Sequence, residues 1–302
     1  MGRQRCCWIT ALLMLLSMGA ARATHIVGGE FRLTHQRGFE WELAMLLYFD
    51  DFHGNPGAED AAVTVGLFER GTHRRVRSVT LNRDRTQQVP YRNIDCVLGG
   101  LRTRKIIYRR SITLEPAEFQ HPEGYYVAWE RCCRNAQITN LEAPSRIGMT
   151  FYLEFPAVAR NGAAYLNSSP AFSLPYGEYA CLGERFTFPF GATDPDGDAL
   201  RYRLVTPLRG NTSQTFPTQA TPRAGPYPEA RWVDNYGTER AIPGAPALRI
   251  DSLTGLLTVL PTRAGLYVFS IECEERRDGR VIGRVRRDFQ LLVTECPRNA
   301  AP

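Results

Sequence analysis

The sequence lacks long apolar stripes at helical spacing. Beyond the first 23 residues, no stretch of about 12 residues repeats apolar side chains every three to four positions, so neither a helical bundle nor an α/β fold is expected. Lys105 is the only lysine, and the chain carries 37 Lys plus Arg against 31 Asp plus Glu. Because these charges are interspersed rather than gathered into a basic patch, we expect no nucleic-acid partner.

Signatures of common enzyme classes are also missing. The chain has no glycine-rich phosphate loop ending in Gly-Lys, no Gly-x-Ser-x-Gly elbow and no His-Glu-x-x-His pair. Residues 26–29, Ile-Val-Gly-Gly, copy the activated N-terminus of trypsin-like proteases, but no serine lies in the Gly-Asp-Ser-Gly setting which that chemistry needs. We therefore predict that the protein is not an enzyme, and that Gly28 and Gly29 mark a bend in the first strand.

The first 23 residues have the pattern of a Sec signal peptide. Arg3 and Arg5 precede an apolar run from Trp8 to Met18, and residues 21–23, Ala-Arg-Ala, form a cleavage signal. The run is shorter than the roughly 20 residues that a membrane span needs, and no second run of spanning length follows. We predict that residues 1–23 are removed and that the product is secreted or displayed at the cell surface, with the periplasm as an alternative.

Export to an oxidising compartment makes disulfide bonds the expected state of the cysteines. Their positions suggest that Cys96 pairs with Cys132 or Cys133, and that Cys181 pairs with Cys296. The adjacent Cys132 and Cys133 have strand-like flanks, which argues against a redox centre at a helix start. We expect each of them to bridge to a different partner.

Hydrophobic residues alternate with polar ones over most of the chain, which is typical of half-buried strands. Clear examples are Val63, Val65 and Leu67, then Met149, Phe151, Leu153 and Phe155, and later Phe186, Phe188 and Phe190, and Phe289, Leu291 and Val293. Many short strands separated by Gly, Pro and Asp turns predict an all-β fold of two tandem antiparallel β-sandwich domains, of the Ig-like kind.

The pattern breaks between Ala157 and Pro170, where we place the domain boundary. The first sandwich is expected to span residues 24–158 and the second residues 169–297, with a short tail at 298–302. Within the second, residues 212–246 are rich in Pro, Thr and Gly and predict a long loop. Its expected aromatic anchors are Phe216, Tyr227, Trp232 and Tyr236.

An acidic turn, residues 191–198, precedes a strand-like segment. Asp194, Asp196 and Asp198 occupy alternate positions, and closely spaced carboxylates of this kind can supply several of the six to eight oxygens that Ca²⁺ prefers. Further ligands would come from another strand, for which Glu272, Glu274 and Asp288 are candidates. The alternative is a plain turn in which Pro195 and Gly197 fix the backbone and the aspartates cap it.

Several stretches in a fixed order resemble a known family. They are residues 24–30, Thr-His-Ile-Val-Gly-Gly-Glu, residues 126–135, Tyr-Val-Ala-Trp-Glu-Arg-Cys-Cys-Arg-Asn, residues 167–172, Asn-Ser-Ser-Pro-Ala-Phe, and residues 194–198, Asp-Pro-Asp-Gly-Asp. Together they resemble the N-terminal region of large Bacteroidota surface proteins described as gliding motility-associated or PKD-domain-containing. Residues 255–257 and 265–267 make the second domain similar to cadherin-like domains. The resemblance implies a non-catalytic secreted or surface protein.

We therefore expect a non-catalytic protein of the bacterial envelope that acts in adhesion, scaffolding or gliding-associated surface assembly. Its partners would be other surface proteins or glycans, and the expected contact region comprises residues 194–198 and 227–236. The alternative function is a carbohydrate-binding module that captures extracellular glycans on exposed Trp or Tyr side chains.

Overall fold

The structure is a computed structural model that describes residues 26–51, 59–90, 103–173, 175 and 179–296. The predicted signal peptide, Cys96 and the predicted tail lie outside these residues. Within them, the only helical segments are two single turns, η3 (Pro144–Arg146) and η4 (Thr238–Arg240), so the prediction of an all-β fold is confirmed. No helix in the described part of the chain is long and apolar enough to cross a membrane.

Eight antiparallel strands close into a barrel. In their order around it they are β1 (Ile26–Arg37), β2 (Glu40–Asp50), β5 (Thr103–Thr113), β4 (Arg75–Gln88), β3 (Ala62–Glu69), β6 (Tyr125–Cys132), β7 (Gly148–Phe155) and β18 (Arg280–Thr294). Closure comes from β18, which pairs with β7 at Arg284 and Val285 and with β1 at Asp288 and Phe289.

The other edge of β18 carries the rest of the sheet. There β18 pairs along almost its whole length with β17 (Gly265–Arg277), and β17 pairs with β14 (Ala199–Val205). On the edge that also pairs with β7 and β1, the short strand β11 (Ala180–Cys181) runs parallel to the end of β18. The remaining short strands are β8 (Ala159–Arg160), β9 (Ala163–Ala164), β10 (Ala171–Phe172), β12 (Phe186–Pro189), β13 (Ala192–Thr193), β15 (Arg249–Ile250) and β16 (Leu256–Val259), in pairs β8–β9 and β10–β13 and a sheet β12–β16–β15.

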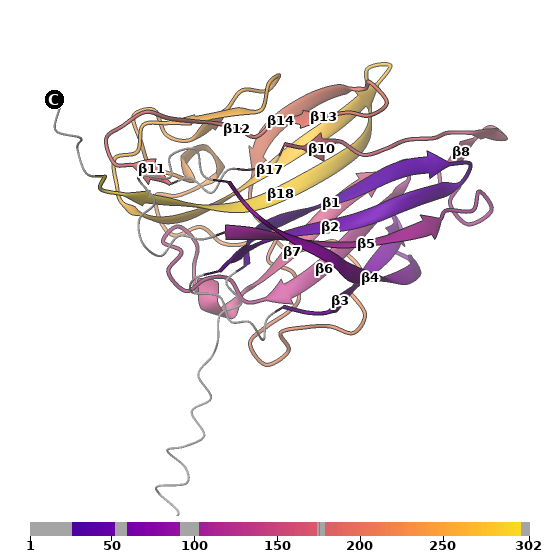
Figure 1. Ribbon diagram of the computed structural model, residues 1–302, viewed down its shortest axis with the longest axis horizontal. Helices are drawn as coiled ribbons and strands as arrows, with labels where there is room; N and C mark the ends of the chain where they lie inside the picture. Colours follow the sequence, from indigo (N-terminus) through magenta and orange to yellow (C-terminus); the bar gives the residue numbers. More distant parts are fainter. Residues whose placement is uncertain (1–25, 52–58, 91–102, 174, 176–178, 297–302) are drawn as a thin grey trace, which may run out of the picture.

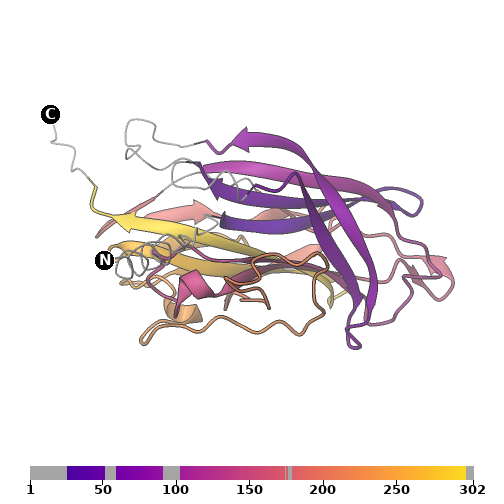
Figure 2. The same cartoon turned by 90° about the horizontal axis from the view of Figure 1, so that it is seen from below.

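The prediction of two tandem β-sandwiches is wrong, because β18 belongs to both halves of the molecule. Figure 1 shows β18 and β17 extending beside the indigo β1 and β2, and Figure 2 shows the yellow β18 between the indigo and purple strands and the orange segments. Alternation identifies which side chains are buried, but it does not determine which strand pairs with each edge. The proposed bounds of the two domains stay a prediction.

The seam between β1 and β18 depends on glycine. A Cβ atom built on Gly28 would lie 2.1 Å from the carbonyl oxygen of Asp288, so only a residue without a side chain allows this approach. The pairing of β1 with β2 also shifts register between Ile26 and Gly28, where the sequence predicted a bend.

A buried ion pair crosses the same seam. Arg287 of β18 donates from Nη2 to Oε1 of Glu30 on β1 at 2.7 Å and from Nε to Oε2 at 2.9 Å. The Tyr48 hydroxyl donates to Glu30 Oε1 at 3.0 Å. Burial is the main cause that raises the pKa of Tyr48, so this hydroxyl stays a donor. The pair is fully satisfied and joins the first strand of the barrel to the last.

Two main clusters of buried side chains fill the molecule. The barrel interior holds the predicted alternating residues of β3 and β7, together with Phe31, Trp41 and Tyr108. The second cluster lies between the β14–β17–β18 part of the sheet and the small β12–β16–β15 sheet, and includes Phe188, Phe190, Phe289, Leu291 and Val293. The alternating pattern therefore identified core residues correctly in both clusters.

Candidate metal centre

The acidic turn lies between β13 and β14, and part of it is a plain capped turn. Oδ1 of Asp194 accepts hydrogen bonds from the backbone N–H groups of Asp196 at 2.9 Å and Asp198 at 3.0 Å. Gly197 has a φ of 81°, a left-handed conformation that favours glycine. These contacts use one oxygen of Asp194 and leave the other carboxylate oxygens of the turn to be explained.

A fourth carboxylate joins the turn from β17. One oxygen from each of Asp194, Asp196, Asp198 and Glu275 can be chosen so that all four lie within 4.8 Å of one another. Glu275 is placed there by strand pairing, since it lies opposite Leu200 of β14. Its side chain is 0% exposed, which is unusual for a glutamate without a cationic partner.

Two oxygens of this cluster are buried without a hydrogen-bond donor, Oδ2 of Asp194 and Oε2 of Glu275. The pKa of Glu275 is raised to about 9, mainly by burial and in addition by the neighbouring carboxylates of Asp194 and Asp198. Burial also raises the pKa of Asp194. Crowded buried carboxylates need a proton or a cation between them, because their mutual repulsion is strong where water is excluded.

Fixed donors hold four other oxygens of the cluster, namely Oε1 of Glu275, Oδ2 of Asp196 and both oxygens of Asp198. Asn167 donates from Nδ2 to Glu275 Oε1 at 2.8 Å, and the backbone N–H of Ser168 donates to Asp196 Oδ2 at 2.5 Å. Arg277 binds Asp198 from Nε at 2.9 Å and from Nη2 at 2.6 Å. One arginine therefore offsets one of four carboxylates and leaves a net negative site.

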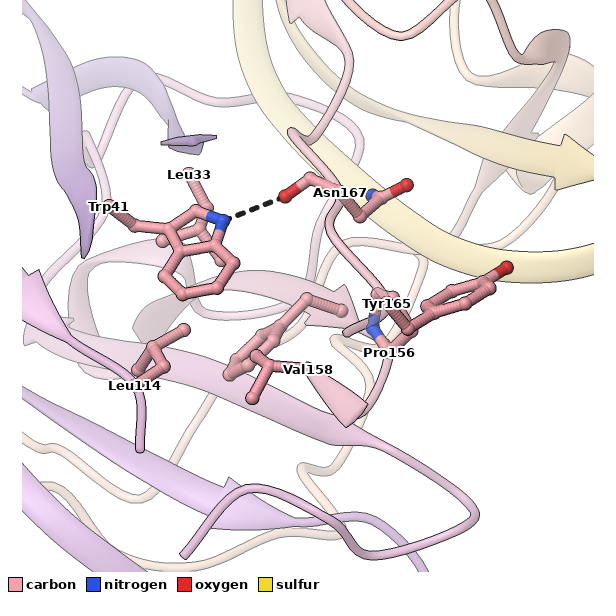
Figure 3. Close-up of a pocket in the computed structure, with 8 residues that line it drawn as sticks. Leu33, Trp41, Leu114, Pro156, Val158, Tyr165 and Asn167 are labelled. Atoms are coloured by element: carbon pink, nitrogen blue, oxygen red, sulfur yellow. Dashed lines mark hydrogen bonds between the residues drawn. The ribbon is translucent and has the colours of Figure 1, made fainter. Parts of the chain in front are cut away.

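Asn167 links this cluster to one end of the barrel. Its backbone carbonyl accepts a hydrogen bond from the indole N–H of Trp41 at 2.8 Å, as Figure 3 shows. Leu33, Leu114 and Val158 line the same small cavity around the indole ring. The segment that anchors the acidic cluster is thus fixed by the barrel core.

The sequence pattern did not identify Glu275 as a ligand, and the three residues that it did suggest as extra ligands are paired with arginines instead. Glu272 pairs with Arg203 and Arg286, Glu274 with Arg276 and Arg284, and Asp288 with Arg134. A signal for Glu275 was present in the alternation. Glu275 continues the core-facing series Phe269, Ile271 and Cys273 of β17, and a carboxylate is out of place in such a series.

Two cysteine pairs lie at disulfide distance. Cys181 and Cys296 pair with a Cα–Cα distance of 5.4 Å, which links β11 to the chain just beyond β18. Cys132 pairs with Cys133, so the expectation that each bridges to a different partner is wrong. Strand-like flanks do not prevent a bond between neighbours at the end of β6. Cys273 is a buried free thiol, and burial raises its pKa to about 12.

The long loop packs against the sheet through most of its predicted anchors. Tyr227 contacts Tyr126 and Tyr152 edge-on, Trp232 donates to the Thr206 hydroxyl at 3.2 Å, and the Tyr236 ring lies 6.1 Å from that of Tyr267. Phe216 does not pack in this way and is 69% exposed.

No protein-family model matches the chain, and no curated protein matches it. Among solved structures, it is similar to a chimeric titin Z1Z2-Z1Z2 tandem functionalized with a GRGDS exogenous peptide from fibronectin, at 11% identity and a TM-score of 0.24. The similarity covers 88% of this chain and 99% of the titin chain. A TM-score this low does not establish a common fold. The resemblance to gliding motility-associated proteins stays a prediction.

Proposed function

We propose that this protein is a calcium-binding, non-catalytic protein of the bacterial envelope that serves adhesion or scaffolding. The observation that carries the proposal is the buried Glu275 carboxylate, which lies among three aspartates. Its Oε2 has no hydrogen-bond donor, and neither has Oδ2 of the neighbouring Asp194. Hard oxygen ligands of this number and charge suit Ca²⁺, with water completing the coordination. The predicted export supports the choice, because extracellular modules bind calcium at roughly 0.1–1 mM.

The ion would act as a structural link. Its ligands come from the turn between β13 and β14 and from β17, and Asn167 connects them to Trp41 in the barrel. A cation there would hold the barrel, the anchoring segment and the β14–β17 pair in one arrangement. A rigid extracellular β-protein of this kind suits adhesion, scaffolding or gliding-associated surface assembly better than turnover of a substrate.

Thermal melting with and without chelator tests the proposal. With Kd at 0.1–1 mM, 10 mM Ca²⁺ should stabilise the protein by about 1.4–2.7 kcal/mol through mass action. Glu275→Gln should abolish the shift. It should melt no lower than wild type in chelator, because its amide can donate to the unpaired oxygen of Asp194.

The matched control is Asp251→Asn. Asp251 also caps a tight turn, accepting hydrogen bonds from the backbone of Leu253 at 3.0 Å and Thr254 at 2.8 Å, but it lies outside the acidic cluster. This variant should keep the calcium shift of wild type. An unchanged melting temperature of wild type at 10 mM Ca²⁺ would refute the proposal. A proton shared between Asp194 and Glu275 would then explain how the two buried carboxylates lie side by side.

A further inference from the structure

A second site lies at the opposite end of β17 from the acidic cluster. A surface cavity of about 310 Å³ is lined by Asp234, Asn235, Tyr236, Arg240, Pro243, Thr262 and Arg263. Its size falls at the lower end of the range for small-ligand pockets, about 300–1,000 Å³. Thr262 and Arg263 lie within three residues of the start of β17, whereas Glu275 and Arg277 lie at its far end.

The cavity carries a net positive charge, because two arginines, Arg240 and Arg263, line it together with one acid. Arg240 and Arg263 are both exposed, and neither makes an ion pair or a side-chain hydrogen bond with any other described residue. Asp234 is the single acid among the lining residues. Guanidinium groups bind carboxylates in a planar, two-bonded geometry, so two free guanidiniums at one cavity favour a ligand that bears a carboxylate.

The other lining groups suit a sugar. The half-buried Tyr236 offers a ring face for stacking on sugar C–H bonds, and Asp234, Asn235 and Thr262 offer donors and acceptors for hydroxyl groups. A peptide would need apolar lining for its side chains, and Pro243 is the only aliphatic residue among those that line the cavity.

Tyr267 holds both sides of the cavity in place. Its ring lies 6.1 Å from that of Tyr236, and its hydroxyl donates to the backbone carbonyl of Arg263 at 3.0 Å. Burial raises the pKa of this hydroxyl to about 12, so it remains a donor at neutral pH. Pre-formed sites lose less entropy when a ligand binds.

We propose that this cavity binds an acidic saccharide, with Arg240 and Arg263 on a uronate carboxylate and Tyr236 stacked on the sugar ring. The proposal goes beyond the calcium site and does not depend on it. It gives the envelope protein a ligand class, carboxylated polysaccharide, recognised through charge and one aromatic platform.

Calorimetric titration at low ionic strength tests this inference on the whole mature chain. The probes are tetragalacturonate, the neutral maltotetraose and the peptide tetraglutamate. We expect tetragalacturonate to bind with a Kd of 1 mM or tighter, at least tenfold more tightly than either control probe. The double variant Arg240→Gln, Arg263→Gln should lose at least about tenfold in affinity.

The matched control is Arg249→Gln, an exposed arginine of β15 that does not line the cavity. It should bind tetragalacturonate as wild type does, and the double variant should keep the wild-type melting temperature because both arginines are exposed. Lack of binding by wild type, equal binding of maltotetraose, equal binding of tetraglutamate, or full affinity in the double variant would each overturn the proposal.

Discussion

Replacing Arg287 by methionine should strongly destabilise the protein, because it leaves the Glu30 carboxylate buried without its partner. The Arg287 side chain is 0% exposed and that of Glu30 is 4% exposed, and two hydrogen bonds join them. Removal of one partner of such a pair costs about 3–5 kcal/mol, since the remaining charge is uncompensated. The carbonyl of Ser173 also loses its donor, Arg287 Nη1 at 3.0 Å.

A double-mutant cycle separates the ion pair from general damage to the core. Glu30→Gln combined with Arg287→Met removes both charges, so the double variant should be more stable than the sum of the two single changes predicts, by about 2 kcal/mol or more. The measurement is chemical denaturation of the oxidised protein, followed by tryptophan fluorescence. Arg37→Gln is the control, because Arg37 forms a 2.9 Å ion pair with Glu40 but is 84% exposed, and its loss should be undetectable.

The outcome reports on the closed barrel directly. Glu30 and Arg287 are 257 positions apart in the sequence, and they meet only because β18 pairs with β1. A cost below about 1 kcal/mol for Arg287→Met, or strictly additive single changes, would contradict the buried pair and the seam that it crosses.

Three further changes test other parts of the fold. Gly28→Ala should lower Tm by about 5 °C or more, because its Cβ would overlap the Asp288 carbonyl, and an unchanged Tm would contradict the seam. Replacing Cys181 and Cys296 together by serine should cost about 2–4 kcal/mol in denaturant unfolding, and no loss would mean that the bond is absent. Burial raises the pKa of Glu130, so wild type loses stability as pH rises above about 4 and the buried carboxyl group ionises. Gln does not titrate, so the stability of Glu130→Gln relative to wild type should increase from pH 4 to pH 7. The opposite trend would refute this.

The positions of strands and core residues could be predicted from the sequence because they depend on local alternation. Val63, Val65 and Leu67 face the barrel interior as their spacing predicted. Closure of the barrel could not be predicted, since it depends on which strand occupies each edge of β18. One edge binds β17 over nearly its full length, while the other is divided among β7, β1 and β11.

The candidate site could be predicted from the sequence only in part, for the same reason. Three aspartates at alternate positions identify an acidic turn, and the turn does use Asp194 as a cap. The fourth carboxylate arrives through the pairing of β14 with β17, a contact between segments far apart in sequence. A glutamate on the core-facing side of a strand is the local signal that would have identified Glu275.

Calorimetric titration of the mature protein with CaCl₂ tests the central claim most directly. The account predicts one bound ion per chain in wild type, and none in Glu275→Gln under the same conditions. Absence of binding heat at millimolar calcium in wild type, or the same isotherm in Glu275→Gln, would contradict it.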